Sequence, residues 1–304
     1  MRRMKKMRGA YIGEASVRRT AMLMIAPAMV IILGMNVYPL LYNVGLSFFW
    51  YNLLDTAKNG FAGVRQFVEV FTNKGFGNSL LITGYFAVVS LVVQTVLGTL
   101  IALLLNMEFK GRGFVRAIVL LPWAVPSMVN AAIWGWILNA NYGLLNRVLL
   151  QWGVIKEIVV WMATAFSALN MIILADTWRM LPLTVLLLLA ALQTLDASTI
   201  EAGIVDGANA FQRFWHIKLP LMKPLLLVLL IMRTTQTIKV FDIIFMMTGG
   251  GPGNGTMAIS FYTYYAIFKN LNYGTGATLS VAISVIILLI AVLYLKVLHT
   301  DDPS

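Results

Sequence analysis

The chain has 304 residues, of which 60% are apolar and only 12% are charged. Because soluble domains carry about one quarter charged residues, this composition excludes a water-soluble enzyme and a disordered chain, and it indicates an exterior that faces lipid. The sequence has no cysteine and only two histidines, which excludes a disulfide scaffold, a thiolate metal site and a histidine-rich metal site. The net charge of +11 leaves nucleic acid, anionic lipid or membrane topology as its explanation.

A strongly basic segment precedes the first long apolar stretch. Residues 1–19 hold seven of the 23 Lys and Arg side chains, and no charged residue follows until Asp55. Signal peptides also begin with a basic segment before an apolar run. Here the run continues for about twenty residues beyond the small residues at 26–28, so we predict an uncleaved membrane helix.

Further stretches with few or no charged residues predict the other membrane helices, since a span needs about 20 mainly apolar residues. Pro122 and Pro126 each remove a backbone hydrogen bond from the third helix. The predicted fold class is an all-α membrane protein with six transmembrane helices and a helical cytoplasmic loop. We expect the six spans at about 21–49, 79–107, 115–139, 165–193, 225–247 and 276–297.

The positions of the cations predict how the chain crosses the membrane. Fourteen Lys and Arg side chains lie in the two terminal segments and in the loops on their side of the membrane, against six in the opposite loops. Because Lys and Arg in short loops stay in the cytoplasm, we predict cytoplasmic termini. The permease domain then covers 20–298, between a basic N-terminus at 1–19 and a tail at 299–304. Because membrane topology accounts for most of the cations, we expect no nucleic acid as a partner.

The loop 195–224, between the fourth and fifth helices, is much longer than a tight connection requires. Ser198 and Glu201 are three residues apart, a capping-box pattern that predicts a short helix through about Val205. The Asp-Gly pair ending at Gly207 predicts a turn, because glycine adopts a positive φ at little cost.

A second short helix is predicted over about 208–216, and Leu219-Pro220 is expected to end it. Two short helices joined at a glycine corner form either a protruding knob that another protein grips or an amphipathic loop that lies on the lipid surface. The apolar face of the second helix would consist of Phe211, Phe214 and Trp215.

The spacing in this loop resembles the signature of permease subunits of bacterial binding-protein-dependent ABC importers. That signature is Glu-Ala-Ala, a glycine after three residues, an isoleucine after nine more, and then Leu-Pro one residue later. Gly203 departs from it, and glycine inside a helix costs about 1 kcal/mol relative to alanine, so we expect a softer first helix. Segments such as LLPWAVPSMVNAAIWGWIL and VFDIIFMMTGGGPGNGT resemble the MalF/UgpA-type branch, which imports carbohydrates and glycerol phosphates. The matching positions are Glu201, Ala202, Gly203, Gly207, Ile217, Leu219 and Pro220.

The resemblance implies a transport subunit of the bacterial cytoplasmic (inner) membrane that translocates a sugar, an oligosaccharide or a glycerol-phosphate-type solute. It implies four partners besides the lipid bilayer: a second, homologous permease subunit, two cytoplasmic ATPase subunits and an extracytoplasmic solute-binding protein. ATP and Mg²⁺ would bind to the ATPases, and no cofactor to this chain. The loop 195–224 would dock on an ATPase, with Glu201 as charged anchor, Gly207 as the corner, and Phe211, Phe214 and Trp215 as the packing surface.

Several charged residues lie inside the predicted spans, where an ionisable group costs a few kcal/mol and usually faces the bundle interior or water. Asp176 and Arg179 are three residues apart on one helix face, as are Lys239 and Asp242, so each pair can form a structural ion pair. Arg233 has no obvious local partner, and on one continuous helix it would point away from Asp242. The alternative is a polar path for a sugar, with Trp178 and Phe241 as stacking faces. The polar residues of this path would be Asp176, Arg179, Arg233, Gln236, Lys239 and Asp242.

Two other function classes make different demands on the sequence. An ion-coupled secondary transporter would use Asp176 or Asp242 as its coupling site and would need no ATPase. A membrane-embedded enzyme would need a nucleophile with a base, or metal ligands, inside the spans, and neither histidine lies in one. The chain also contains no G-x-x-x-x-G-K-[ST] motif, so we do not expect it to hydrolyse ATP itself.

Overall fold

The computed structural model of the chain describes residues 14–299, and side-chain burial is defined from 18 to 297. Most of the predicted N-terminal segment and C-terminal tail lies outside the described residues. Within them the fold is all-α apart from one antiparallel hairpin of β1 (Phe49–Trp50) and β2 (Gly60–Phe61). The helices are α1 Glu14–Ile32, α2 Tyr38–Leu46, α3 Arg65–Thr72, α4 Lys74–Asn106, α5 Arg112–Leu120, α6 Ser127–Ile137, α7 Leu144–Gln151, α8 Ala165–Gln193, α9 Ala197–Val205, α10 Ala210–Arg213, α11 Leu219–Ile238, α12 Asp242–Met247, α13 Ile259–Phe268 and α14 Tyr273–His299.

Five helical segments in the described part are long and apolar enough to cross a membrane, and a bent pair brings the number to six. The bent pair is α5 and α6, whose axes differ by 94°. A short 3₁₀ turn and an extended residue separate them, at the place where Pro122 and Pro126 interrupt the helical hydrogen bonds. The third predicted helix is therefore broken in two. Pro182, by contrast, lies inside α8 without ending it.

The fifth predicted helix, 225–247, lies within the membrane-length segment Ala210–Met247, but it is not one continuous α-helix. It begins earlier, because α10 continues through a π-helical turn at Phe214–Lys218 into α11, and it stops at Ile238. The chain then turns at 239–241 before α12 begins. The threonines just before the break favour this ending, because Thr235 and Thr237 donate hydrogen bonds to backbone carbonyls within their own helix.

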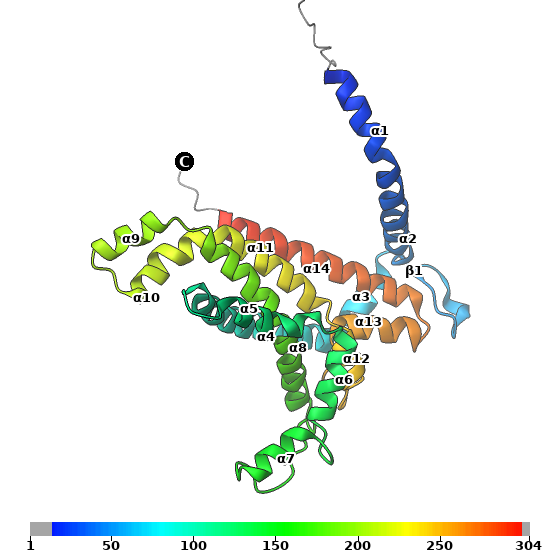
Figure 1. Cartoon of the computed structure of the whole chain (residues 1–304). Coiled ribbons are helices and arrows are strands. Elements are labelled where there is room, and N and C mark those ends of the chain that lie inside the picture. The colour runs from blue at the N-terminus through cyan, green and yellow to red at the C-terminus, as the bar shows by residue number, and fades with distance from the viewer. Residues whose placement is uncertain (1–13, 300–304) are drawn as a thin grey trace, which may run out of the picture.

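The helices surround a core in which α4 and α8 pack against each other along much of their length, with α11 beside both (Figure 1). The cluster at one end of this packing consists of Ala102, Leu105, Val185, Leu188, Leu189, Ala191, Leu192, Met222 and Leu229. α1 projects away from the other helices, and none of the residues in its membrane-length segment is buried within this chain (Figure 1).

Close packing of α4 on α8 depends on Gly98. A Cβ atom at this position would lie 2.7 Å from the Thr184 Cγ2 atom. Because Thr184 is β-branched and lies in a packed helix, its side chain cannot easily move away. We expect Gly98→Ala to destabilise the folded chain by about 1–3 kcal/mol. Gly84→Ala is the matched control, because it lies on the same helix with open space around it and should stabilise by up to about 1 kcal/mol. Thermal unfolding in detergent measures both changes, and equal effects at the two positions would contradict the packing argument.

Candidate functional site

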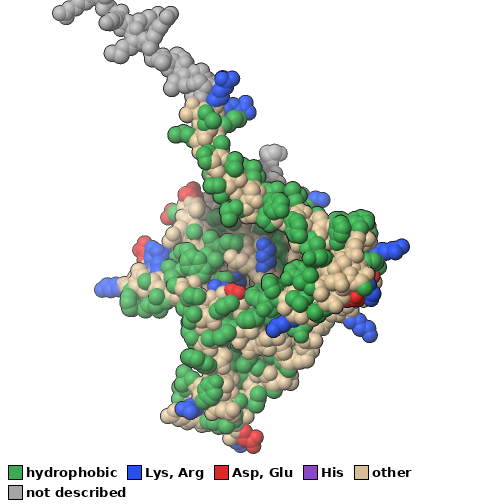
Figure 2. Space-filling view, turned by 90° about the vertical axis from the view of Figure 1, so that its right-hand side faces the viewer, with side chains coloured by type: hydrophobic (Ala, Val, Ile, Leu, Met, Phe, Trp, Pro, Cys, Tyr) green, Lys and Arg blue, Asp and Glu red, His purple; other side chains and the backbone are tan. Residues whose placement is uncertain are grey.

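A polar pocket of about 240 Å³ lies where α6, α8, α11 and α12 meet. Figure 2 shows basic and acidic side chains inside a hollow on a face that is otherwise mainly hydrophobic. Seven of the eight residues predicted for the sugar path line the pocket. Its lining residues are Phe86, Ser127, Asp176, Arg179, Met180, Arg233, Gln236, Thr237, Lys239, Val240, Phe241, Asp242 and Ile243.

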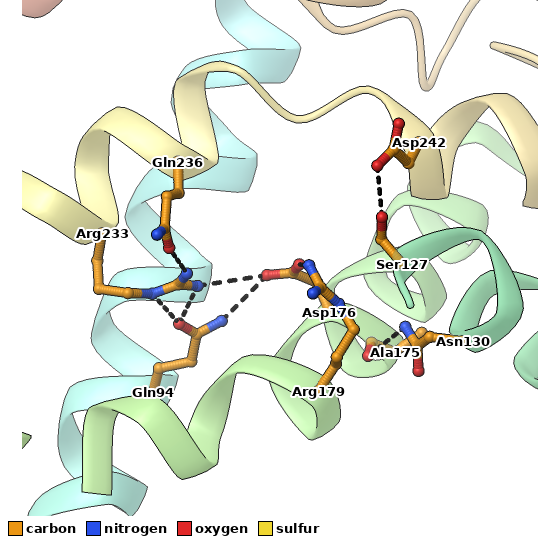
Figure 3. Close-up of polar contacts among 9 residues, drawn as sticks. All are labelled: Gln94, Ser127, Asn130, Ala175, Asp176, Arg179, Arg233, Gln236 and Asp242. Carbon is orange, nitrogen blue, oxygen red and sulfur yellow. Dashed lines mark hydrogen bonds and ion pairs between the residues drawn. The ribbon is translucent and has the colours of Figure 1, made fainter. Parts of the chain in front are cut away.

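At one side of the pocket, three helices are joined through the guanidinium group of Arg233 (Figure 3). Arg233 is only 1% exposed and lies 3.5 Å from the carboxylate of Asp176, which is 6% exposed. Gln94 on α4 bridges the two: its Oε1 accepts from Arg233 Nε at 2.9 Å, and its Nε2 donates to Asp176 at 3.2 Å. Both buried charges are thus paired and hydrogen-bonded, as burial in a low dielectric requires.

Arg233, predicted to have no local partner, therefore has partners on α4 and α8. Its second terminal nitrogen, Nη1, donates to Gln236 Oε1 on its own helix. Arg179 lies 3.9 Å from Asp176 in the predicted ion pair, and its Nε atom is buried with no hydrogen-bond partner among the described residues. The network therefore includes one buried donor, Arg179 Nε, that has no hydrogen bond among the described residues.

The break between α11 and α12 changes where Asp242 lies. On a continuous helix Asp242 would point away from Arg233, but both residues line this pocket because the chain leaves the helix at 239–241 before α12 begins. Asp242 accepts a hydrogen bond from Ser127 at the start of α6 (Figure 3). Lys239 is exposed and forms no ion pair with Asp242 among the described residues, so the predicted pair is wrong.

Two aromatic residues predicted to offer stacking faces have different positions. Phe241 lines the pocket and packs against the rings of Phe245 and Tyr264. Trp178 does not line it; its ring contacts Trp134 edge to face, with centroids 6.2 Å apart, and is partly exposed. The interpretation of Trp178 as a pocket residue is therefore wrong, because its helix face differs from that of Asp176 and Arg179.

Sequence reasoning missed Gln94 and Ser127. A signal for Gln94 was present, since an amide in a long apolar helix must find hydrogen-bond partners inside the bundle. Ser127 had no comparable signal, because it follows Pro126 at a break and its partner Asp242 is 115 residues away.

The loop 195–224 forms two helices at the end of the helix bundle (Figure 1). The N-cap of α9 is Asp196, whose side chain accepts from the Ser198 backbone N–H; the predicted cap at Ser198 is wrong by two residues. Hydrogen bonds from the Ser198 hydroxyl and backbone hold the pKa of the Asp196 carboxyl below its usual range. The second helix has a capping box in which Asn209 and Gln212 bond each other's backbone N–H groups.

The predicted turn lies at Gly207, which has φ +80, a backbone conformation that favours glycine. Gly203 is buried, and a Cβ atom there would lie 2.5 Å from the Ile217 side chain. The lack of a side chain at Gly203 therefore leaves room for Ile217. This explains why glycine stands at this position, and the sequence alone did not reveal it. Leu219-Pro220 does not end the second helix; Pro220 directly follows the π-helical turn at Phe214–Lys218, and the helix continues through it into α11.

The outer surface of this loop combines charged and apolar side chains. Glu201 and Ala202 are exposed at its first helix, where Val205 is 86% exposed. Phe211 is 71% exposed, and the ring of Trp215 packs against both Phe211 and Phe214. The loop therefore presents an aromatic cluster and a carboxylate away from the bundle.

Comparison with known proteins agrees with these features. The chain matches the family described as binding-protein-dependent transport system inner membrane component over residues 94–299, more than half of its length. It is 40% identical over 281 residues to the trehalose/maltose transport system permease protein MalF of Thermococcus litoralis, covering 90% of this chain and 92% of the relative. It is 33% identical over 285 residues to the sulfoquinovosyl glycerol transport system permease protein SmoG of Agrobacterium fabrum, covering 94% and 92%.

A crystal structure of a bacterial ABC transporter involved in the import of the acidic polysaccharide alginate has the same fold, with a TM-score of 0.80 at 23% identity over 95% of this chain and 99% of that chain. A second crystal structure, also with a TM-score of 0.80, holds the alginate transporter in complex with an alginate pentasaccharide-bound periplasmic protein. The chain therefore belongs to the family of binding-protein-dependent inner-membrane transport components, the multi-pass permease subunits of ABC importers, and is a transport subunit and not an enzyme.

Proposed function

We propose that the chain is the permease subunit of an ATP-driven importer for a sugar or oligosaccharide delivered by an external solute-binding protein. The observation that carries the proposal is the 40% identity to a trehalose/maltose permease along nearly the whole of both chains. A glycerol-phosphate-type solute has less support, because the pocket holds carboxylates as well as cations.

The polar pocket is the proposed substrate path. Each sugar hydroxyl that leaves water needs a new hydrogen-bond partner, and the pocket provides charged and amide groups of both donor and acceptor type. The exposed Lys239 is a donor that remains free for a ligand, and Arg179 also lines the pocket. Phe241 adds an aromatic face.

The loop 195–224 is the proposed docking site for an ATPase subunit on the cytoplasmic side, with Glu201, Ala202, Gly203, Gly207, Phe211, Phe214, Trp215, Leu219 and Pro220 as its elements. ATP and Mg²⁺ would bind to the two ATPases, and a second permease subunit would complete the path. The excess of cations at the chain's ends and on this side supports cytoplasmic termini. Closure of the ATPases would move the loop and tilt the helices around the pocket from inward-open to outward-open.

An ion-coupled carrier has little support from the carboxylates. Asp176 is held by Arg233, Arg179 and Gln94, and Asp242 accepts from Ser127, so neither is an unpaired group in the pocket. The family of the chain also points to ATP as the energy source.

Purification of the chain with its partner subunits tests the proposal. We expect ATPase subunits to co-purify, and we expect a solute-binding protein loaded with the right member of a sugar panel to stimulate ATP hydrolysis and uptake into proteoliposomes. Uptake that follows a proton or sodium gradient without ATP would contradict it.

A further inference from the structure

A second pocket lies at the opposite end of the bundle from the loop 195–224. It is formed by the β1–β2 hairpin, by α3 and by the turn before α14 (Figure 1). Its volume is about 450 Å³, within the range of about 300–1,000 Å³ that is typical of small-molecule sites. It shares no lining residue with the polar pocket, and with the proposed orientation it opens to the outside.

The pocket is a built feature of the chain. The backbone of Leu53 donates to Leu271 and that of Gly274 donates to Tyr51, so the hairpin is fixed to the start of α14. Two asparagines, Asn52 and Asn272, form the bridge between these segments. Most lining side chains therefore lie on two segments that are hydrogen-bonded to each other, and Glu69 comes from a third element, α3.

Several side chains offer unused hydrogen-bonding capacity. The Oδ1 atoms of Asn52 and Asn272 cap local backbone N–H groups, but their amide nitrogens donate to no described residue. Glu69 accepts from Trp50 Nε1 at 3.2 Å through one oxygen and keeps the other free. The pocket thus combines two amide donors, a carboxylate acceptor and the rings of Trp50 and Tyr51.

This chemistry favours a neutral polyhydroxyl ligand over an ion. Asp55 and Lys58 are paired at 3.7 Å, so Glu69 is the remaining charge among the lining residues. A sugar ring presents hydroxyls that donate and accept in one plane and C–H groups on its face, which match amides, a carboxylate and an aromatic wall.

We propose that this pocket is a second saccharide-binding site, at the outer face of the permease. This proposal rests on the proposed function, in which the substrate is a carbohydrate. It adds a site at which one sugar ring binds before or after the sugar leaves the solute-binding protein. Glu69 and Asn272 supply the hydrogen bonds, and Trp50 supplies the stacking face.

The test uses the full chain in lipid nanodiscs with maltose and trehalose as probes. The chain is labelled with 5-fluorotryptophan, and the Trp50 resonance is assigned as the signal that Trp50→Phe removes. We expect this resonance to shift on titration with at least one probe. Glu69→Gln and Asn272→Asp should each weaken that binding by about tenfold. Both substitutions keep the oxygen that serves the local structure, at Trp50 Nε1 and at the Thr275 N–H.

Asn73→Asp is the matched control, since it keeps its cap on Gly75 and lies outside the pocket. An unmoved Trp50 resonance, or equal affinity in all variants, overturns the proposal. Unchanged sugar binding together with weaker binding of the solute-binding protein also overturns it, because the surface would then dock a protein. If the carbohydrate function itself is wrong, the assembled transporter imports no sugar at all, whereas failure of this proposal alone leaves uptake normal.

Discussion

Arg233→Met is expected to destabilise the folded chain by about 3 kcal/mol and to abolish transport. Loss of one partner of a buried ion pair costs about 3–5 kcal/mol, because the other charge remains in a low dielectric without compensation. Asp176 and Gln94 would both lose their bonds to the guanidinium group. The low end of the range applies because Arg179 stays 3.9 Å from Asp176. Thermal unfolding of the purified chain gives the stability change, and uptake into proteoliposomes gives the activity.

Two further variants separate the ion pair from the polar path. Arg233→Met combined with Asp176→Leu removes the Arg233–Asp176 pair but leaves Arg179 without its carboxylate, so we expect part of the stability to return while transport stays lost. Lys239→Met is the control for loss of a cation in the same pocket, since Lys239 is exposed, and its effect on stability should stay within about 0.5 kcal/mol. Arg233→Met with unchanged stability would contradict the buried network.

Gly207→Val is expected to abolish uptake while the chain remains folded in the membrane. The φ of +80 at this corner is strained for any other residue, at a cost of about 1–3 kcal/mol, and more so for a β-branched one. Relief of that strain would change the angle between α9 and α10 and separate Glu201 from the aromatic cluster. We expect ATPase stimulation and sugar uptake to fall to the background of a transporter without this chain.

The control for Gly207→Val has the same backbone strain at a different place. Gly153 has φ +69 and open space around it, and it lies in the loop after α7, outside the predicted docking surface. Gly153→Val should therefore cost similar stability and leave uptake close to that of the wild type.

Glu201→Lys should also abolish uptake. Its control is Glu157→Lys, which reverses the charge of another exposed glutamate. Uptake by Gly207→Val or Glu201→Lys at control levels would contradict the docking role.

The sequence predicted some elements closely and others poorly, for identifiable reasons. The helix predicted at 165–193 has the same bounds as α8, because its start has a capping box at Thr164 and its length is that of a span. The break at 239–241 was missed because hydropathy reports composition and not where the backbone leaves the helix. Because the break was missed, Asp242 was expected to point away from Arg233. It lines the same pocket because α11 stops at Ile238.

In the candidate site, too, some residues could be predicted from the sequence and others could not. Charged residues in apolar helices identified Asp176, Arg179 and Arg233, since buried charges are rare and need partners. Which partners they have depends on how α4 packs against α8 and α11, and Gln94 joins the network only through that packing. Helix periodicity within one segment cannot predict such a contact.

The absence of cysteine from the chain allows one direct measurement of the substrate path. Gln236→Cys places a thiol in the polar pocket, and Leu288→Cys places one on the exposed apolar surface of α14 as a control. In an otherwise cysteine-free transporter that imports a sugar, we expect a water-soluble thiol reagent to label position 236, to stop uptake, and to react several-fold more slowly when that sugar is saturating. Position 288 should stay unlabelled. Equal labelling of position 236 with and without the sugar, together with normal uptake after labelling, would contradict the assignment of this pocket as the path.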